Sequence, residues 1–222
     1  MGQFFRNNGL SVVLFAIFAV SLAGQFVTGH HEFNEEQTEH GAREVSALEY
    51  AGEGHFIEAV FENWESEFLQ MAAYIIFTIF LYQKGSSESK DPGRIERVDV
   101  IPGEAAERPE TPYPVRRGGW MLKLYQNSLA LAFLVLFALS FALHAYGGAA
   151  EYNRDAALHK SGPPVTTLEY AGTSRFWFES FQNWQSEFLS IGLMVVLSVW
   201  LRQKGSPESK PVDAPHSDTG TA

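Results

Sequence analysis

The chain carries the same sequence pattern twice. Residues 48–90 and 168–210 align without a gap at an offset of 120, and 21 of the 43 aligned positions are identical. The identical positions include Leu-Glu-Tyr-Ala-Gly and, further on, Asn-Trp-x-Ser-Glu-Phe-Leu. The similarity continues upstream at an offset of 119. Self-similarity over half a chain is typical of proteins built from two related structural units, so we expect two halves with the same local structure.

Four apolar segments alternate with polar ones. The first and third hold no Asp, Glu, Lys or Arg over more than 20 residues, which is enough to cross a hydrocarbon core of about 30 Å. The second and fourth are shorter, and each follows an amphipathic stretch beginning near Phe56 or Phe176. We therefore predict an all-α membrane protein with transmembrane helices at about 9–28, 64–84, 124–146 and 184–203. An interfacial amphipathic helix is expected to lead into each second span.

The distribution of Lys and Arg predicts the orientation of these helices. The loop between the first two holds only Arg43, whereas the segment between the second and third holds eight basic residues. Because basic loops stay in the cytoplasm, we expect both termini and the central segment inside. The halves are then tandem parallel-repeat hairpins. The expected parts are a first repeat at 1–84 with an outer loop at 30–63, a Pro-rich linker at 85–119, a second repeat at 120–204 and a disordered tail at 205–222.

An alternative interpretation of the first apolar segment is a secretory signal. Arg6, the apolar stretch and Ser21-Leu22-Ala23 fit a signal peptide that is cleaved after Ala23. The matching segment of the second half lies in the middle of the chain and cannot be a signal. We therefore expect the first helix to be retained.

The repeated Asn-Trp-x-Ser-Glu motif suggests a site at the outer membrane boundary. Its glutamates fall within the ~20 residues that a span needs, and a carboxylate at that depth is costly unless it faces a partner or water. The candidate ion or partner site comprises Glu67, Glu187, Ser66, Ser186, Asn63 and Asn183. The other interpretation is that both glutamates lie at the headgroup level and cap or orient their helices.

Other repeated residues suggest structural roles. We expect aromatic anchors at the membrane interface at Trp64, Trp184, Tyr50 and Tyr170. Small residues four apart permit close approach of membrane helices, which predicts a packing seam at Ala19, Ala23, Ala138 and Ala142. The alternative use of those alanines is self-association.

The first outer loop is rich in histidine and carboxylates. His30, His31 and His40 lie among glutamates and offer ligands for zinc or another divalent ion. The second half has alanines at the positions of His30 and His31, however, which favours a solvated acidic loop.

Composition excludes several classes of function. The chain has no cysteine, so it forms no disulfides, and its net charge of −10 argues against nucleic acid as a partner. It contains no nucleophile elbow, phosphate loop or zinc-protease motif. We expect no enzymatic activity and no cofactor; action on lipid by the interfacial helices is a remote third alternative.

Three motifs together resemble a known family. They are His-His-Glu-Phe-Asn-Glu-Glu-Gln at 30–37, Glu-Asn-Trp-Glu-Ser-Glu-Phe-Leu-Gln-Met at 62–71 and the repeated Gln-Lys-Gly-Ser-x-Glu-Ser-Lys. They resemble a family of uncharacterised bacterial membrane proteins, described as a domain of unknown function. The resemblance implies a location in the bacterial inner membrane and transfers no activity.

Two functions follow as hypotheses. The first is a non-enzymatic scaffold or accessory subunit that lies in the lipid bilayer and associates with a membrane-protein partner or with copies of itself. The second is a small oligomeric proton or cation transporter or channel that uses Glu67 and Glu187.

Overall fold

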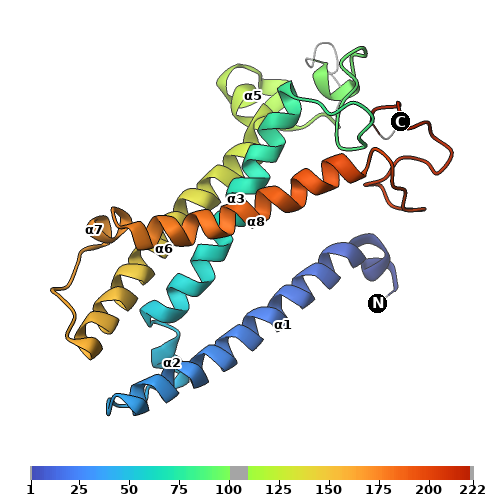
Figure 1. Ribbon diagram of the computed structural model, residues 1–222. Helices are drawn as coiled ribbons and strands as arrows, with labels where there is room; N and C mark the ends of the chain where they lie inside the picture. The colour runs from blue at the N-terminus through green and yellow to red at the C-terminus, as the bar shows by residue number, and fades with distance from the viewer. Residues whose placement is uncertain (1, 101–109, 221–222) are drawn as a thin grey trace. The chain divides into compact units, whose positions relative to one another are not determined.

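All regular structure in the described residues, 2–100 and 110–220, is helical in the computed structural model (Figure 1). Part of the predicted linker, 101–109, and the end of the predicted tail lie outside these residues. The helices are α1 (Gly2–Glu39), α2 (Ala47–Tyr50), α3 (Gly54–Phe80), η1 (Arg97–Asp99), α4 (Tyr113–Arg117), α5 (Gly119–Gln126), α6 (Ser128–His159), α7 (Thr167–Ala171) and α8 (Ser174–Leu197).

Two helices are long and apolar enough to cross a membrane. They are α1 and α6, with mean hydropathies of 2.3 and 2.2 over their most apolar windows. The second and fourth predicted spans correspond to α3 and α8, which do not reach that hydropathy. Their N-terminal halves carry Glu, Gln and Asn side chains, which lower the mean. By length and composition, the all-helical prediction is therefore confirmed with two candidate spans rather than four.

The chain forms two compact units, and each draws on both halves of the sequence. The first contains residues 1–61 and 142–177, and the second contains 62–141 and 178–222. These units therefore do not coincide with the predicted repeats at 1–84 and 120–204. In the first unit, the turns that follow α1 and α6 belong to the same compact body.

The same turn is built twice in the first unit. Asn34 donates from Nδ2 to the Val45 carbonyl and accepts from the Val45 N–H, at 2.9 and 2.8 Å. Asn153 makes the same two bonds to Val165, at 2.8 and 2.7 Å. Each clamp leads into a capping box, Ser46 with Glu49 before α2 and Thr166 with Glu169 before α7. The repeated glutamate of Leu-Glu-Tyr-Ala-Gly is therefore a helix-capping residue.

The repeated tyrosines are buried within the first unit. Tyr50 and Tyr170, predicted as membrane-interface anchors, are 1% and 0% exposed. Each ring lies directly against a repeated glycine, Gly29 for Tyr50 and Gly148 for Tyr170. A side chain at either glycine would occupy the position of the ring, so the repeated Gly and Tyr form one packing pair in each half.

In the first unit, α3 and α6 approach each other closely at two glycines. A Cβ at Gly54 of α3 would lie 2.7 Å from the Gly147 carbonyl oxygen of α6, and a Cβ at Gly147 would lie 2.5 Å from the Glu58 N. The alanines predicted as the packing seam, Ala19, Ala23, Ala138 and Ala142, are all exposed. The close contact between α3 and α6 therefore involves glycines that the alanine spacing does not predict.

The second unit also contains a repeated turn. Ser89 Oγ accepts from the Gln83 N–H and Ser209 Oγ accepts from the Gln203 N–H, each at 2.9 Å. Gly85 and Gly205 adopt φ values of 86° and 87°, which explains why both copies carry glycine there. The motif Gln-Lys-Gly-Ser-x-Glu-Ser-Lys therefore encodes a turn that follows α3 and α8.

The described part of the tail, for which the sequence predicts disorder after residue 205, consists of turns and bends held by hydrogen bonds. Lys210 is 2% exposed, and its ammonium donates to the carbonyls of Pro215, His216 and Asp218 at 3.2, 3.2 and 2.8 Å. Burial lowers the pKa of Lys210. The tail also returns to the first of the two turns, where the Gly220 N–H donates to the Ser86 carbonyl at 2.9 Å. These backbone and side-chain bonds replace the hydrophobic core that the segment lacks.

Candidate functional site

The predicted glutamate pair lies on α3 and α8 in the second unit, but its members are not the buried carboxylates. Glu67 is exposed and Glu187 is partly exposed. The fully buried carboxylate is Glu65, at 0% exposure, two residues before Glu67 and therefore on another face of α3. The buried carboxylate of this motif is therefore Glu65, which is not a member of the predicted pair.

Polar side chains of α3 and α8 meet along what we term the α3–α8 seam, formed by Glu62, Glu65, Gln70, Asn183, Trp184 and Ser190. Trp184 donates from Nε1 to Glu65 Oε1 at 3.3 Å, and Asn183 donates from Nδ2 to Glu62 Oε1 at 2.5 Å. Gln70 donates from Nε2 to the Glu187 carbonyl at 2.6 Å. Trp184, predicted as an interfacial anchor, therefore has a polar partner inside the unit.

The remaining predicted residues of this site have local roles. Ser66 Oγ donates to the Asn63 carbonyl at 2.7 Å, and Ser186 Oγ donates to the Asn183 carbonyl at 2.8 Å. Both serines bond to the backbone of their own helix, three residues upstream, in the middle of α3 and of α8. Trp64 packs its ring on Phe68, with ring centroids 6.3 Å apart.

The seam is chemically asymmetric, although the helices that form it are repeats. Glu62 and Glu65 of α3 align with Gln182 and Gln185 of α8. One helix thus brings carboxylates and the other brings amides at matching positions. Both side chains accept hydrogen bonds, and only the carboxylates can carry charge or a proton.

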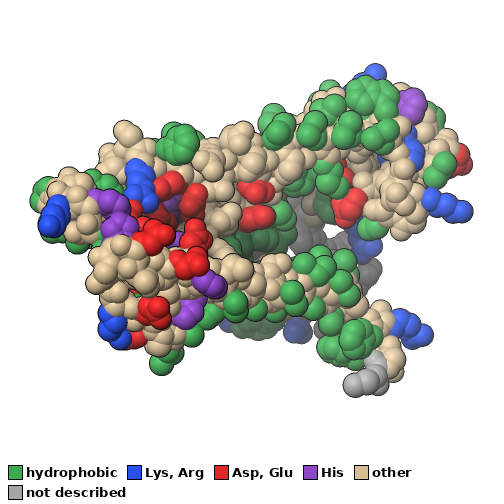
Figure 2. Space-filling view, turned by 60° about the horizontal axis from the view of Figure 1, so that its bottom comes forward, with side chains coloured by type: hydrophobic (Ala, Val, Ile, Leu, Met, Phe, Trp, Pro, Cys, Tyr) green, Lys and Arg blue, Asp and Glu red, His purple; other side chains and the backbone are tan. Residues whose placement is uncertain are grey.

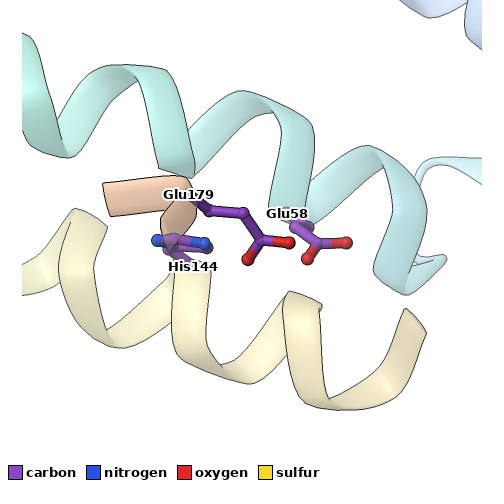
Figure 3. A group of neighbouring side chains, drawn as sticks. All are labelled: Glu58, His144 and Glu179. Atoms are coloured by element: carbon purple, nitrogen blue, oxygen red, sulfur yellow. The ribbon is translucent and has the colours of Figure 1, made fainter. Parts of the chain in front are cut away.

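A second buried polar group lies in the first unit. Glu58 of α3 and His144 of α6 are 7% and 0% exposed, and each offers a metal-ligand atom within 4.8 Å of the other's. Figure 3 shows the two side chains on their helices; Glu179, also labelled there, is carried by α8 in the second unit. Tyr170 OH donates to Glu58 Oε1 at 2.9 Å, and the Phe176 ring covers the His144 ring with centroids 4.6 Å apart.

Arg154 organises the charges around this region of the first unit. Its Nη2 lies 2.7 Å from Glu36 Oε2, 2.5 Å from Glu151 Oε1 and 3.2 Å from Asp155 Oδ1. The guanidinium also lies over the Phe33 ring, 4.6 Å from its centroid. Figure 2 shows acidic and histidine side chains gathered in one region of the face in view. Because Arg154 pairs with these three carboxylates, we interpret them as an ion-pair network.

The three histidines predicted as metal ligands do not form a site together. His30 Nε2 lies 2.8 Å from the Val45 carbonyl oxygen, where it supports the Asn34 clamp. His31 is exposed beside Glu35, and His40 packs its ring on His159 with centroids 5.0 Å apart. None of the three belongs to the ligand groups found in the described residues. His30 and His31 are successive residues of α1 and therefore point about 100° apart, and His40 follows the end of that helix.

Sequence reasoning missed Glu58, His144 as a ligand, and Arg154. One signal was present: each stands where the two copies differ. His144 aligns with Gln25, Glu58 with Phe178 and Arg154 with Glu35. A charge reversal between copies, Glu35 to Arg154, fits an ion pair between the two halves.

Taken together, the fold and these sites define a duplicated all-helical protein with two candidate membrane spans and buried carboxylates in both units. The chain belongs to the family described as "Domain of unknown function (DUF6766)", whose model matches residues 1–221. This confirms the resemblance to a family of unknown function. Comparison with curated proteins and with solved structures finds no match.

Proposed function

We propose that the chain is an integral membrane protein with four crossings. The observation that supports this most directly lies in the first unit, where Arg154 near the C-terminal end of α6 pairs with Glu36 near the C-terminal end of α1. If α1 and α6 both cross, these ends lie on the same side of the membrane. The chain between them must then return across the bilayer, and α3 is the helix available for that crossing.

The same reasoning applies to α8. In the second unit the tail after α8 bonds to the turn after α3: Thr219 Oγ1 accepts from the Gly85 N–H at 2.9 Å, and Ser198 Oγ lies 2.7 Å from Ser86 Oγ. The two turns therefore share a side of the membrane. A fourth crossing by α8 satisfies this, with the basic central segment and both termini in the cytoplasm of a bacterial cell.

We further propose that the protein is a non-enzymatic scaffold or accessory subunit for a membrane-protein partner. The residues that both halves share have structural roles: Asn clamps, capping boxes, Gly–Tyr pairs and Ser-bonded turns. These repeated residues hold the helices and turns in place, which supports a structural role for the protein.

The crossing number can be tested because the chain contains no cysteine. Single cysteines at the exposed positions Ala47, Ser161, Pro92 and Pro207 would be treated with a membrane-impermeant maleimide. With four crossings, the first two label in intact spheroplasts and the last two only after permeabilisation. Opposite behaviour of Ala47→Cys and Ser161→Cys would show that α3 does not cross.

The accessory role is tested on the intact protein in a mild detergent. Native mass spectrometry should find the chain in a stoichiometric complex with a different membrane protein. A homogeneous assembly of this chain alone, in membranes where the protein is expressed at its normal level, would reject the role and favour transport.

The transport alternative is favoured by one observation, the burial of Glu65 in the α3–α8 seam. An ionisable side chain inside a membrane helix bundle commonly marks an ion path. Vesicles containing wild-type protein should then pass protons or cations faster than empty vesicles, and Glu65→Gln should abolish the difference. Gln is the residue at matching position 185, so the substitution suits the helix. The double variant Glu67→Gln/Glu187→Gln tests the original pair. Equal flux in wild-type and empty vesicles rejects this function.

A further inference from the structure

We propose that Glu58 and His144 bind a divalent transition-metal ion within the first unit. Their side chains come from two different helices, α3 and α6, and place a carboxylate oxygen and an imidazole nitrogen within 4.8 Å of each other. Two ligands of one zinc ion lie about 2.0–2.2 Å from the metal, hence roughly 3–3.5 Å apart. This separation falls inside the 4.8 Å within which the two ligand atoms lie.

The surroundings resemble those of metal ligands. Tyr170 donates its hydroxyl to Glu58 Oε1 at 2.9 Å, and Arg175 Nη2 lies 4.0 Å from the same oxygen. A hydrogen bond of this kind orients a ligating carboxylate and is a usual feature of the outer shell of a metal site. A metal bound by Oε2 would leave the Tyr170 bond in place. The Phe176 ring, 0% exposed, packs over the face of the His144 ring at an interplanar angle of 32°.

Glu58 and His144 are both residues that the other half of the repeat lacks. The first half has Gln25 where the second has His144, and the second half has Phe178 where the first has Glu58. The chain therefore has a single copy of this ligand pair on a duplicated frame. The Gly54–Gly147 crossing brings α3 and α6 close directly beside it, since a Cβ at Gly147 would meet the Glu58 N at 2.5 Å.

The ligand types select the metal class. Imidazole with carboxylate suits Zn²⁺ and first-row ions such as Mn²⁺ and Fe²⁺, and the chain has no thiolate that would favour Cu⁺. Water completes the coordination in this proposal. No redox step is involved, and the site is independent of the proposed accessory role.

The test uses purified full-length protein and Zn²⁺ as the probe. After loading and desalting, elemental analysis should find about one zinc per chain, and His144→Gln and Glu58→Gln should lose it. Tyr170→Phe should weaken binding by about 10-fold or more, as expected for loss of an outer-shell bond. His144→Gln installs the residue that the first half carries at position 25, so the helix should tolerate it.

The matched control is the triple variant His30→Gln/His31→Gln/His40→Gln, which removes the other histidines of α1 and the loop that follows it but should retain zinc. Loss of zinc from the triple variant with retention in His144→Gln would assign the metal to the exposed loop and overturn the proposal. Wild-type protein without zinc would also overturn it. Should His144→Gln fail to fold by gel filtration, zinc-edge X-ray absorption on the triple variant, which keeps His144, decides. Imidazole scattering with ligands at about 2.0–2.1 Å supports the site, and an all-oxygen shell rejects it.

Discussion

Substitution of Gly147 by alanine tests the helix crossing that brings Glu58 and His144 together. The added Cβ would lie 2.5 Å from the Glu58 N, 2.8 Å from Ile57 Cγ2 and 3.0 Å from the Ile57 carbonyl carbon. Two of these three atoms belong to the backbone of α3 and cannot rotate away. The helices must therefore separate by roughly 1 Å to restore ordinary contact.

The expected loss of stability is the difference between two effects. Overpacking of a close contact costs about 1–3 kcal/mol and more when backbone must move, so we take about 3 kcal/mol here. Alanine gains about 1 kcal/mol over glycine through helix propensity. We therefore expect Gly147→Ala to lower the free energy of unfolding by about 2 kcal/mol. The control is Gly24→Ala on α1, where a Cβ meets nothing within 4 Å and only the propensity gain remains.

Equilibrium unfolding in mixed detergent micelles, followed by circular dichroism, would measure both variants. The midpoint should fall for Gly147→Ala and rise slightly or stay level for Gly24→Ala. A Gly147→Ala protein as stable as wild type would refute the close crossing. Because the crossing also positions the proposed ligands, this variant should bind Zn²⁺ more weakly than Gly24→Ala.

Three further results are expected. Asn153→Ala removes both bonds of the second clamp and should destabilise the protein by about 1–3 kcal/mol in the same unfolding assay. Tyr170→Phe should lower stability by about 1–3 kcal/mol, since a buried carboxylate loses its donor, whereas an exposed tyrosine such as Tyr146 should tolerate the change within about 0.5 kcal/mol. The hydrogen bond from Arg43, with the bonds to the Ser46 backbone and hydroxyl, lowers the pKa of Glu49 to about 2. The contribution of Glu49 is therefore present above its unfolded pKa near 4.5 and is lost as pH falls toward 2, so the stability difference between wild type and Glu49→Gln should shrink over that range.

The repeat made much of the fold predictable. The helix class, the paired turns and the special status of Leu-Glu-Tyr-Ala-Gly follow from the sequence, because capping boxes and glycine turns are local. The burial of Tyr50 and Tyr170 cannot be predicted from the residues next to them in the sequence. Their burial depends on Gly29 and Gly148, which lie about 20 residues upstream, and an aromatic ring near an apolar helix fits an interface equally well.

The site was harder to predict because it depends on which helix face is covered. Within Glu-Ser-Glu at 65–67, residues two apart point about 200° from each other around a helix. The sequence favours Glu67 because it recurs as Glu187, whereas the buried carboxylate is the unrepeated Glu65. The buried Glu65, Glu58 and His144 stand where the copies have diverged, whereas the buried Glu151 and Lys210 recur as Glu32 and Lys90.

Because the copies have diverged, two unequal halves in one chain can form ion pairs that two identical halves could not. In the first unit Arg154 neutralises Glu36 of the other half at 2.7 Å. In a symmetric pair of first halves, position 154 would carry the equivalent of Glu35, and a carboxylate would face a carboxylate. Like charges at that distance repel by several kcal/mol at a partly buried site. The pair Glu58 and His144 would likewise become glutamate and glutamine, which lacks the imidazole ligand. Joining the halves in one chain allows them to carry opposite charges at matching positions, so an ion-pair network and a single mixed ligand pair can form on a repeated frame.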